Sequence, residues 1–233
     1  MPSDQHSAPS LSFLDGIKQT PLEAEFLDEC GDGEWTVNDS GLSSYFFNVH
    51  FPGLGRGPGV VTKIIGKDTS NTAMDLAGGS NGAALQDLID IGAIGKGLLT
   101  NYEDRRCPAS RYNPLVDHIA GNLVHRDTWQ KIIEWASLNT NGGFDLILHR
   151  PVGGLQYLPT RFYSGAAQVI VDLLKPGGVA FLQIPYLLAD VYDNPEITRI
   201  GKELSRNPKV KGVLKASSSD GYDQHALVFR SHS

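Results

Sequence analysis

The feature that most constrains this fold is an alternation of strand-like and helix-like segments from about residue 70 onward. Apolar stretches of strand length lie at residues 73–77, 97–102, 118–124, 144–148 and 179–184, and helix-like stretches lie at 83–91, 128–138 and 166–174. Strands that alternate with helices predict a parallel sheet. Two further strand-like stretches, at 212–216 and 226–229, predict a C-terminal antiparallel hairpin.

A glycine-rich turn follows the first of these strands. Residues 75–82 read Asp-Leu-Ala-Gly-Gly-Ser-Asn-Gly and lie between a strand and a helix. Glycine lets the backbone approach a ligand closely, and the N-terminus of a helix supplies free N–H groups for a polar or anionic group. A plain connection between a strand and a helix is the alternative, but the context favours a ligand-binding turn.

This turn resembles the first S-adenosylmethionine (SAM) binding motif of class I methyltransferases, commonly Asp-Leu-Gly-Gly-Gly-Ser-Gly. Ala77 and Asn81 replace two of its glycines. Residues 143–148 (Gly-Phe-Asp-Leu-Ile-Leu) are similar to the family's fourth strand, and residues 173–181 contain the Leu-Lys-Pro-Gly-Gly that precedes its fifth. The three matches have family-like order and spacing.

The resemblance implies a Rossmann-like α/β fold with a seven-stranded, mostly parallel sheet, a C-terminal antiparallel hairpin and helices on both faces. Residues 67–233 would form the SAM-binding catalytic domain. Residues 1–66 would form an N-terminal helical and loop segment. The aromatic residues 45–51 within it are interpreted either as a lid over the substrate or as simple packing against the first helix.

The resemblance also implies which residues contact the cofactor. The backbone of Ala77, Gly78 and Gly79 would line the methionine half of SAM, and Asp75 would lie close to its ammonium group. Asn81 keeps the turn feasible, since asparagine tolerates positive φ better than other non-glycine residues.

For the ribose, the family uses an acidic residue after its second strand. The candidates are Glu103 and Asp104, with Asn101 a weaker third because it lies inside the predicted strand. A solvated helix N-terminus is an equal interpretation of Glu103 and Asp104. Asn122 stands where the family often has an aspartate for the adenine, and it is equally interpreted as an ordinary turn asparagine.

The reacting groups are expected at the end of the fourth predicted strand, because ligands of open parallel sheets bind beyond the carboxyl ends of the strands. His149 is a candidate general base and Arg150 a candidate clamp for a substrate carboxylate. Tyr186 is a candidate for cation–π contact with the sulfonium. The alternative for His149 is a strand-end histidine with satisfied hydrogen bonds, that for Arg150 is a structural ion pair, and that for Tyr186 is core packing. The chain has neither Asn-Pro-Pro-Tyr nor Asp-Pro-Pro-Tyr at this point, and no Pro-Cys nucleophile.

These features predict a SAM-dependent methyltransferase that transfers the methyl group by SN2 displacement to a small-molecule acceptor. Two alternatives stay open. One is an enzyme of this fold that attacks the methionine carbon chain of SAM, for example by intramolecular cyclisation, and releases methylthioadenosine. The other is a non-catalytic SAM-binding protein, because a fold does not fix a function.

Composition limits the partners that we expect. The chain carries 26 acidic and 20 basic residues, a net charge of -6, and its densest basic cluster is Arg105-Arg106. From this we predict no nucleic-acid partner, since phosphate contacts need clustered Lys and Arg, although one local basic groove stays open. No apolar run reaches the roughly 20 residues that span a bilayer, so we expect no membrane partner and a cytoplasmic location. A homodimer stays open.

No metal site is expected. The two cysteines, Cys30 and Cys107, have no zinc-like spacing, and Asp117, His118 and His125 fit no strong metal-ligand pattern.

Overall fold

The computed structural model describes residues 9–17, 41–44, 49–56, 59–79, 81–104, 106–149, 158–184, 195–218 and 225–232. The strands are β1 (Val49–Phe51), β2 (Gly55–Arg56), β3 (Thr72–Leu76), β4 (Lys96–Asn101), β5 (Val116–Ala120), β6 (Phe144–His149), β7 (Leu174–Ile184), β8 (Val210–Ser218) and β9 (His225–Ser231). The helices are η1 (Ser12–Leu14), η3 (Gly41–Ser44), α2 (Gly59–Ile65), α3 (Ala83–Asp90), α4 (Pro108–Arg111), α5 (Arg126–Asn139), α6 (Thr160–Leu173) and α7 (Pro195–Arg206).

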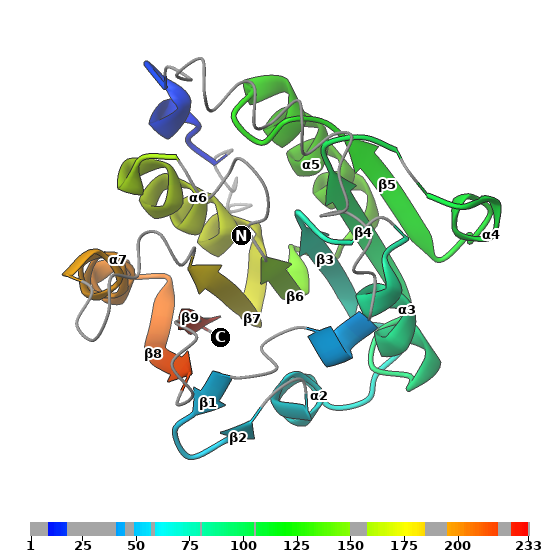
Figure 1. The fold of residues 1–233 in the computed structure, drawn as a ribbon, viewed down its shortest axis with the longest axis horizontal. Helices are drawn as coiled ribbons and strands as arrows, with labels where there is room; N and C mark the ends of the chain where they lie inside the picture. The colour runs from blue at the N-terminus through cyan, green and yellow to red at the C-terminus, as the bar shows by residue number, and fades with distance from the viewer. Residues whose placement is uncertain are drawn as a thin grey trace, which may run out of the picture.

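The described strands form one sheet in the order β2-β1-β8-β9-β7-β6-β3-β4-β5 (Figure 1). The five strands from β7 to β5 in this order run parallel, whereas β9 is antiparallel to both β7 and β8. The predicted seven-stranded, mostly parallel sheet with its C-terminal hairpin is thus confirmed in β3 to β9. The two additional strands, β1 and β2, were not predicted, because three and two residues are too short to show an alternating pattern.

Helices cover both faces of the sheet, as predicted. One buried cluster joins the sheet to α5, α6, α7 and η1, and it includes Trp129 and Phe162, both fully buried. Phe13, in η1, makes edge contacts with these two rings, at centroid distances of 5.8 and 5.6 Å. A second cluster joins the sheet to α2, α3 and η3. Phe51 belongs to this second cluster and contacts Phe181 in β7.

The described parts of the N-terminal segment contribute to the sheet itself. β1 pairs antiparallel with the end of β8, joining His50 to Ser217. Phe51 is fully buried, so this member of the aromatic segment packs in the core. Residues 45–48 of the same segment lie outside the described residues. Among the described helices, none combines the length and apolar composition that a membrane crossing requires.

Two element boundaries differ from the prediction by five residues or more. The Lys-Pro-Gly-Gly segment was expected to end a helix before the fifth strand, but it lies inside β7. Leu174 already pairs with Phe144 of β6, and the register shifts between Phe144 and Leu146, so the segment forms an irregularity within the strand. α6 begins at Thr160, six residues before its predicted start, because Phe162 and Tyr163 also pack into the core.

The helix α7 was not predicted at all. Ile197, Ile200 and Leu204 are fully buried and recur at the i, i+3, i+7 spacing of an amphipathic helix. That spacing is visible in the sequence and was the signal available to find α7.

Candidate functional site

The carboxyl ends of three adjacent strands bring the candidate site together. Leu76 of β3 pairs with Thr100 of β4 on one side and with His149 of β6 on the other. The residues that follow these three positions therefore emerge at the same edge of the sheet, where open parallel sheets bind their ligands.

The glycine-rich turn begins with an alanine in a left-handed conformation. Ala77 has a φ of 59° and is the single non-glycine residue with positive φ in the described part of the chain. Its N–H donates to the Thr100 hydroxyl at 3.1 Å, and the N–H of Gly78 donates to the Thr100 carbonyl at 3.1 Å. Both bonds fix the turn to β4, and Ala77 takes a conformation that a glycine would adopt without a steric penalty.

We expect an Ala77→Gly variant to be more stable than the wild type. Left-handed backbone costs an alanine about 1–2 kcal/mol, and the greater freedom of glycine in the unfolded chain offsets part of this. The net expectation is a gain of up to about 1 kcal/mol in the free energy of unfolding, measured by urea denaturation. Ala73→Gly, at a buried position of β3, is the matched control and should be destabilising. A loss of stability in Ala77→Gly would contradict the conclusion that the backbone at Ala77 is strained.

Asp75 lies directly beneath the turn. Its side chain is fully buried, and a Cβ added at Gly78 would lie 2.5 Å from the Asp75 carboxyl carbon. Atoms at that distance overlap, so position 78 has to be glycine while the carboxylate keeps this place. The sequence prediction put both residues at the cofactor, and the structure brings them into contact.

Asn101 connects the turn to the neighbouring strand. Its Nδ2 donates to the Gly79 carbonyl at 3.2 Å, and its Oδ1 is hydrogen-bonded to Nε2 of His118 in β5. Burial, followed by the nearby Arg106 guanidinium, lowers the pKa of His118 to about 4. His118 is therefore neutral at pH 7, and its Nε2 carries the hydrogen that Asn101 Oδ1 accepts. Sequence reasoning considered His118 only as a metal ligand and missed this contact.

The other two ribose candidates, Glu103 and Asp104, are exposed. The carboxylate of Asp104 accepts from Arg106 Nε at 2.9 Å, and this hydrogen bond holds the pKa of Asp104 well below its usual range. Asn81, at the far end of the turn, accepts the backbone N–H of Cys107 through Oδ1 at 2.7 Å. Asn101 is thus the candidate that the described hydrogen bonds tie to the glycine turn.

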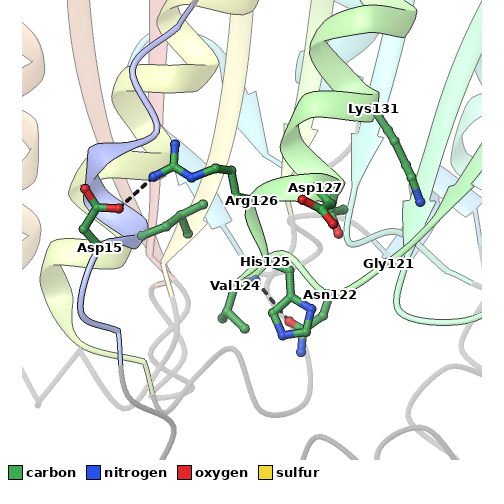
Figure 2. A pocket seen from close by; sticks show the side chains of 10 residues that line it. Asp15, Gly121, Asn122, Val124, His125, Arg126, Asp127 and Lys131 are labelled. Atoms are coloured by element: carbon green, nitrogen blue, oxygen red, sulfur yellow. Dashed lines mark hydrogen bonds and ion pairs between the residues drawn. The ribbon is translucent and has the colours of Figure 1, made fainter.

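A cavity of about 520 Å³ lies between η1, the turn after β5 and the first residues of α5 (Figure 2). Asn122 lines it, and its Oδ1 accepts the N–H of Val124 at 3.1 Å. Arg126, on the opposite side, pairs with Asp15 at 2.7 Å. The Asn122 carbonyl therefore shapes the local turn, and its amide NH2 is the group that can serve a ligand.

His149 is the last residue of β6 and is 1% exposed. Neither ring nitrogen has a hydrogen-bond partner among the described residues. Burial lowers the pKa of His149 to about 3, so its imidazole is neutral at pH 7. An unpartnered polar ring in the interior destabilises a protein, which is the pattern of a group kept for a ligand. The two other reactive candidates, Arg150 and Tyr186, lie outside the described residues.

No protein-family model matches this chain, and no curated protein matches its sequence. Solved structures do match it. A chain of the complex between the Haloferax volcanii Trm112 methyltransferase activator and a putative methyltransferase is 12% identical, with a TM-score of 0.51, over 93% of this chain and 100% of that one. A methyltransferase from Pyrococcus furiosus is 16% identical, with a TM-score of 0.50, over 75% and 81%.

The chain adopts the class I methyltransferase fold. An rRNA methylase from Streptococcus thermophilus is also similar, with 10% identity and a TM-score of 0.49 over 74% of this chain and 92% of that one. The match to TrmN from Thermus thermophilus spans 47% of that protein's length. At these identities, the likeness concerns the fold.

The partner prediction made from the sequence, a small-molecule substrate with nucleic acid excluded, was wrong. A solved chain with this fold comes from a complex between a methyltransferase activator protein and a putative methyltransferase. Net charge averages over the whole chain and says little about one surface, and the same fold serves different acceptors. Nucleic-acid and protein partners therefore belong among those to be tested.

Proposed function

We propose that this chain is a SAM-dependent methyltransferase that binds SAM at the carboxyl ends of β3, β4 and β5. The observation that carries the proposal is the folded glycine turn. Its Ala77 has positive φ, its Gly78 lies against the buried Asp75 carboxylate, and its Gly79 carbonyl is held by Asn101. A turn pinned in this way presents backbone to a ligand without reorganising when the ligand binds.

The residues present fit the cofactor. The Asp75 carboxylate has the charge that an α-ammonium group requires. Asn101 and His118 together would replace an acidic ribose ligand, since Asn101 Nδ2 has a second hydrogen to offer a ribose oxygen. The Asn122 amide would face the adenine from the cavity beside α5.

When bound, SAM would supply a sulfonium methyl group: the acceptor would bond to the methyl carbon as the carbon–sulfur bond breaks, and S-adenosylhomocysteine would leave. His149 lies at the edge of the sheet where the acceptor would approach. A neutral imidazole avoids repulsion with the sulfonium, and its unprotonated nitrogen can accept a hydrogen bond from the acceptor. Its burial also removes water, which strengthens these interactions.

The binding test is a calorimetric titration with SAM and with S-adenosylhomocysteine. We expect Asn101→Ala to weaken both affinities about 2- to 10-fold, which corresponds to one lost hydrogen bond of 0.5–1.5 kcal/mol. Glu103→Ala and Asp104→Ala, two and three residues further along, are the matched comparisons and should retain the wild-type affinity. A larger loss in either acidic variant than in Asn101→Ala would assign the ribose to that carboxylate instead.

A further inference from the structure

The surface of α7 and β8 carries a concentration of positive charge in a protein that is acidic overall. Residues 199–215 contain six basic side chains and one acidic one, whereas the whole chain carries 26 acidic and 20 basic residues. We refer to the six, Arg199, Lys202, Arg206, Lys209, Lys211 and Lys215, as the basic strip. Other residues separate these six side chains in the sequence, so they form no contiguous basic run. For this reason the search for basic clusters in the sequence did not find them.

The fold places the helical members of the strip on one face. Arg199, Lys202 and Arg206 follow the i, i+3, i+7 spacing, so they lie on the same side of α7. The opposite side, with Ile197 and Leu204, is fully buried against the sheet. The helical members of the strip therefore lie on the solvent face of α7, and the apolar face of this helix is buried in the core.

The strand members continue the strip onto β8. Lys211 lies at the register shift between Val210 and Gly212, and Lys215 is further along the same strand; both are exposed. β8 runs parallel to β7, because both are antiparallel to β9. The carboxyl end of β8, near Lys215, thus points to the sheet edge where His149 lies.

Most of the charge on the strip is uncompensated. Arg199 pairs with Glu203, and Lys209 pairs with Asp172 of α6 at 2.6 Å. The other four members have no ion pair or side-chain hydrogen bond among the described residues: Lys202, Arg206, Lys211 and Lys215. Four exposed, unpaired cations on adjoining elements favour binding to a polyanion.

We propose that the basic strip binds the phosphate backbone of a nucleic acid. Exposed lysine and arginine side chains on one face are the usual means of contacting phosphates, and such contacts release counterions. An anionic membrane fits less well, because interfacial helices insert an apolar face and that of α7 is buried. The proposal does not depend on SAM binding.

The test measures binding of fluorescein-labelled 20-nucleotide single-stranded RNA and DNA of one sequence, by fluorescence polarisation between 50 and 200 mM salt and without SAM. The variant is Lys202→Gln/Arg206→Gln/Lys211→Gln, all at exposed positions. The matched control, Lys63→Gln/Lys67→Gln/Arg230→Gln, removes the same charge from exposed positions outside the strip.

We expect the strip variant to bind both probes about 10-fold more weakly or worse. Its plot of log K against log salt should also be less steep, by about 2, since each of the three lost single-strand phosphate contacts contributes about 0.7 to the slope. The control should stay within about 2-fold of the wild type. Equal losses in both variants would show a bulk charge effect and overturn the proposal. So would a loss confined to one probe, absence of wild-type binding at 50 mM salt, or equally tight binding to poly-glutamate or phosphatidylserine vesicles.

Discussion

A Gly78→Ala variant is expected to bind SAM about 10- to 100-fold more weakly than the wild type. The added Cβ would lie 2.5 Å from the carboxyl carbon of Asp75 and 2.9 Å from its Oδ1. Either the turn or the fully buried carboxylate has to move, and overpacking of this kind costs about 1–3 kcal/mol. The loss should appear in calorimetric titrations with both SAM and S-adenosylhomocysteine, because both share the methionine portion.

The matched control for this variant is Gly59→Ala. Gly59 is the first residue of α2, and a Cβ added there would meet no atom within 4 Å. We expect this control to retain the wild-type affinity and stability. If Gly78→Ala bound SAM as tightly as the control while remaining folded, the glycine turn would not be the cofactor site.

A His149→Leu variant is expected to be more stable than the wild type and to transfer the methyl group more slowly. The imidazole is fully buried with both nitrogens unpartnered among the described residues, and each unsatisfied buried polar group costs about 1–3 kcal/mol. Leucine has a similar volume and no polar atoms. Activity should fall about 2- to 10-fold if the imidazole accepts a hydrogen bond from the acceptor, since such a bond contributes about 0.5–1.5 kcal/mol.

The same variant should change the pH dependence of stability. In the folded chain the pKa of His149 is lowered to about 3 from its usual value of 6.5, so at pH 5 the unfolded chain takes up a proton at this residue and the folded chain does not. Stability is therefore lost as the pH falls, by about 2 kcal/mol at pH 5. Chemical denaturation at pH 7.5 and pH 5 gives the free energy of unfolding at each pH. Between the two, His149→Leu should lose about 2 kcal/mol less of this free energy than the wild type.

His50→Leu, at an exposed position of β1, is the comparison for this experiment and should bring no comparable gain in stability. A His149→Leu protein that is less stable than the wild type would mean that the imidazole has partners in the folded chain. A variant that keeps full methyl transfer would remove His149 from the chemistry.

The sheet could be predicted from sequence because its strands and helices carry strong periodic patterns. The first strand was predicted at 73–77 and lies at Thr72–Leu76, and the helix after it was predicted at 83–91 and lies at Ala83–Asp90. Elements whose signal is short or depends on tertiary pairing were missed. β1 has three residues and is ordered by pairing with β8, which is more than 150 residues away in sequence.

The glycine turn was also predictable, because backbone requirements leave a mark on residue type. Side-chain networks leave no such mark. Asn101 was ranked below Glu103 and Asp104 because it lies inside the predicted strand, although its position at the end of β4 puts its amide against the turn. The contact of Asn101 with His118 joins β4 to the next strand, and only the sheet register brings the two side chains together.

The central claim is tested most directly by incubating the purified chain with SAM and an acceptor pool of cellular RNA and metabolites. The measurement identifies the nucleoside that forms. Mass spectrometry should detect S-adenosylhomocysteine that requires the pool and is absent with Gly78→Ala. Methylthioadenosine, formed with or without the pool, would show attack on the carbon chain and contradict methyl transfer. Intact SAM, together with no calorimetric binding, would contradict the SAM site itself.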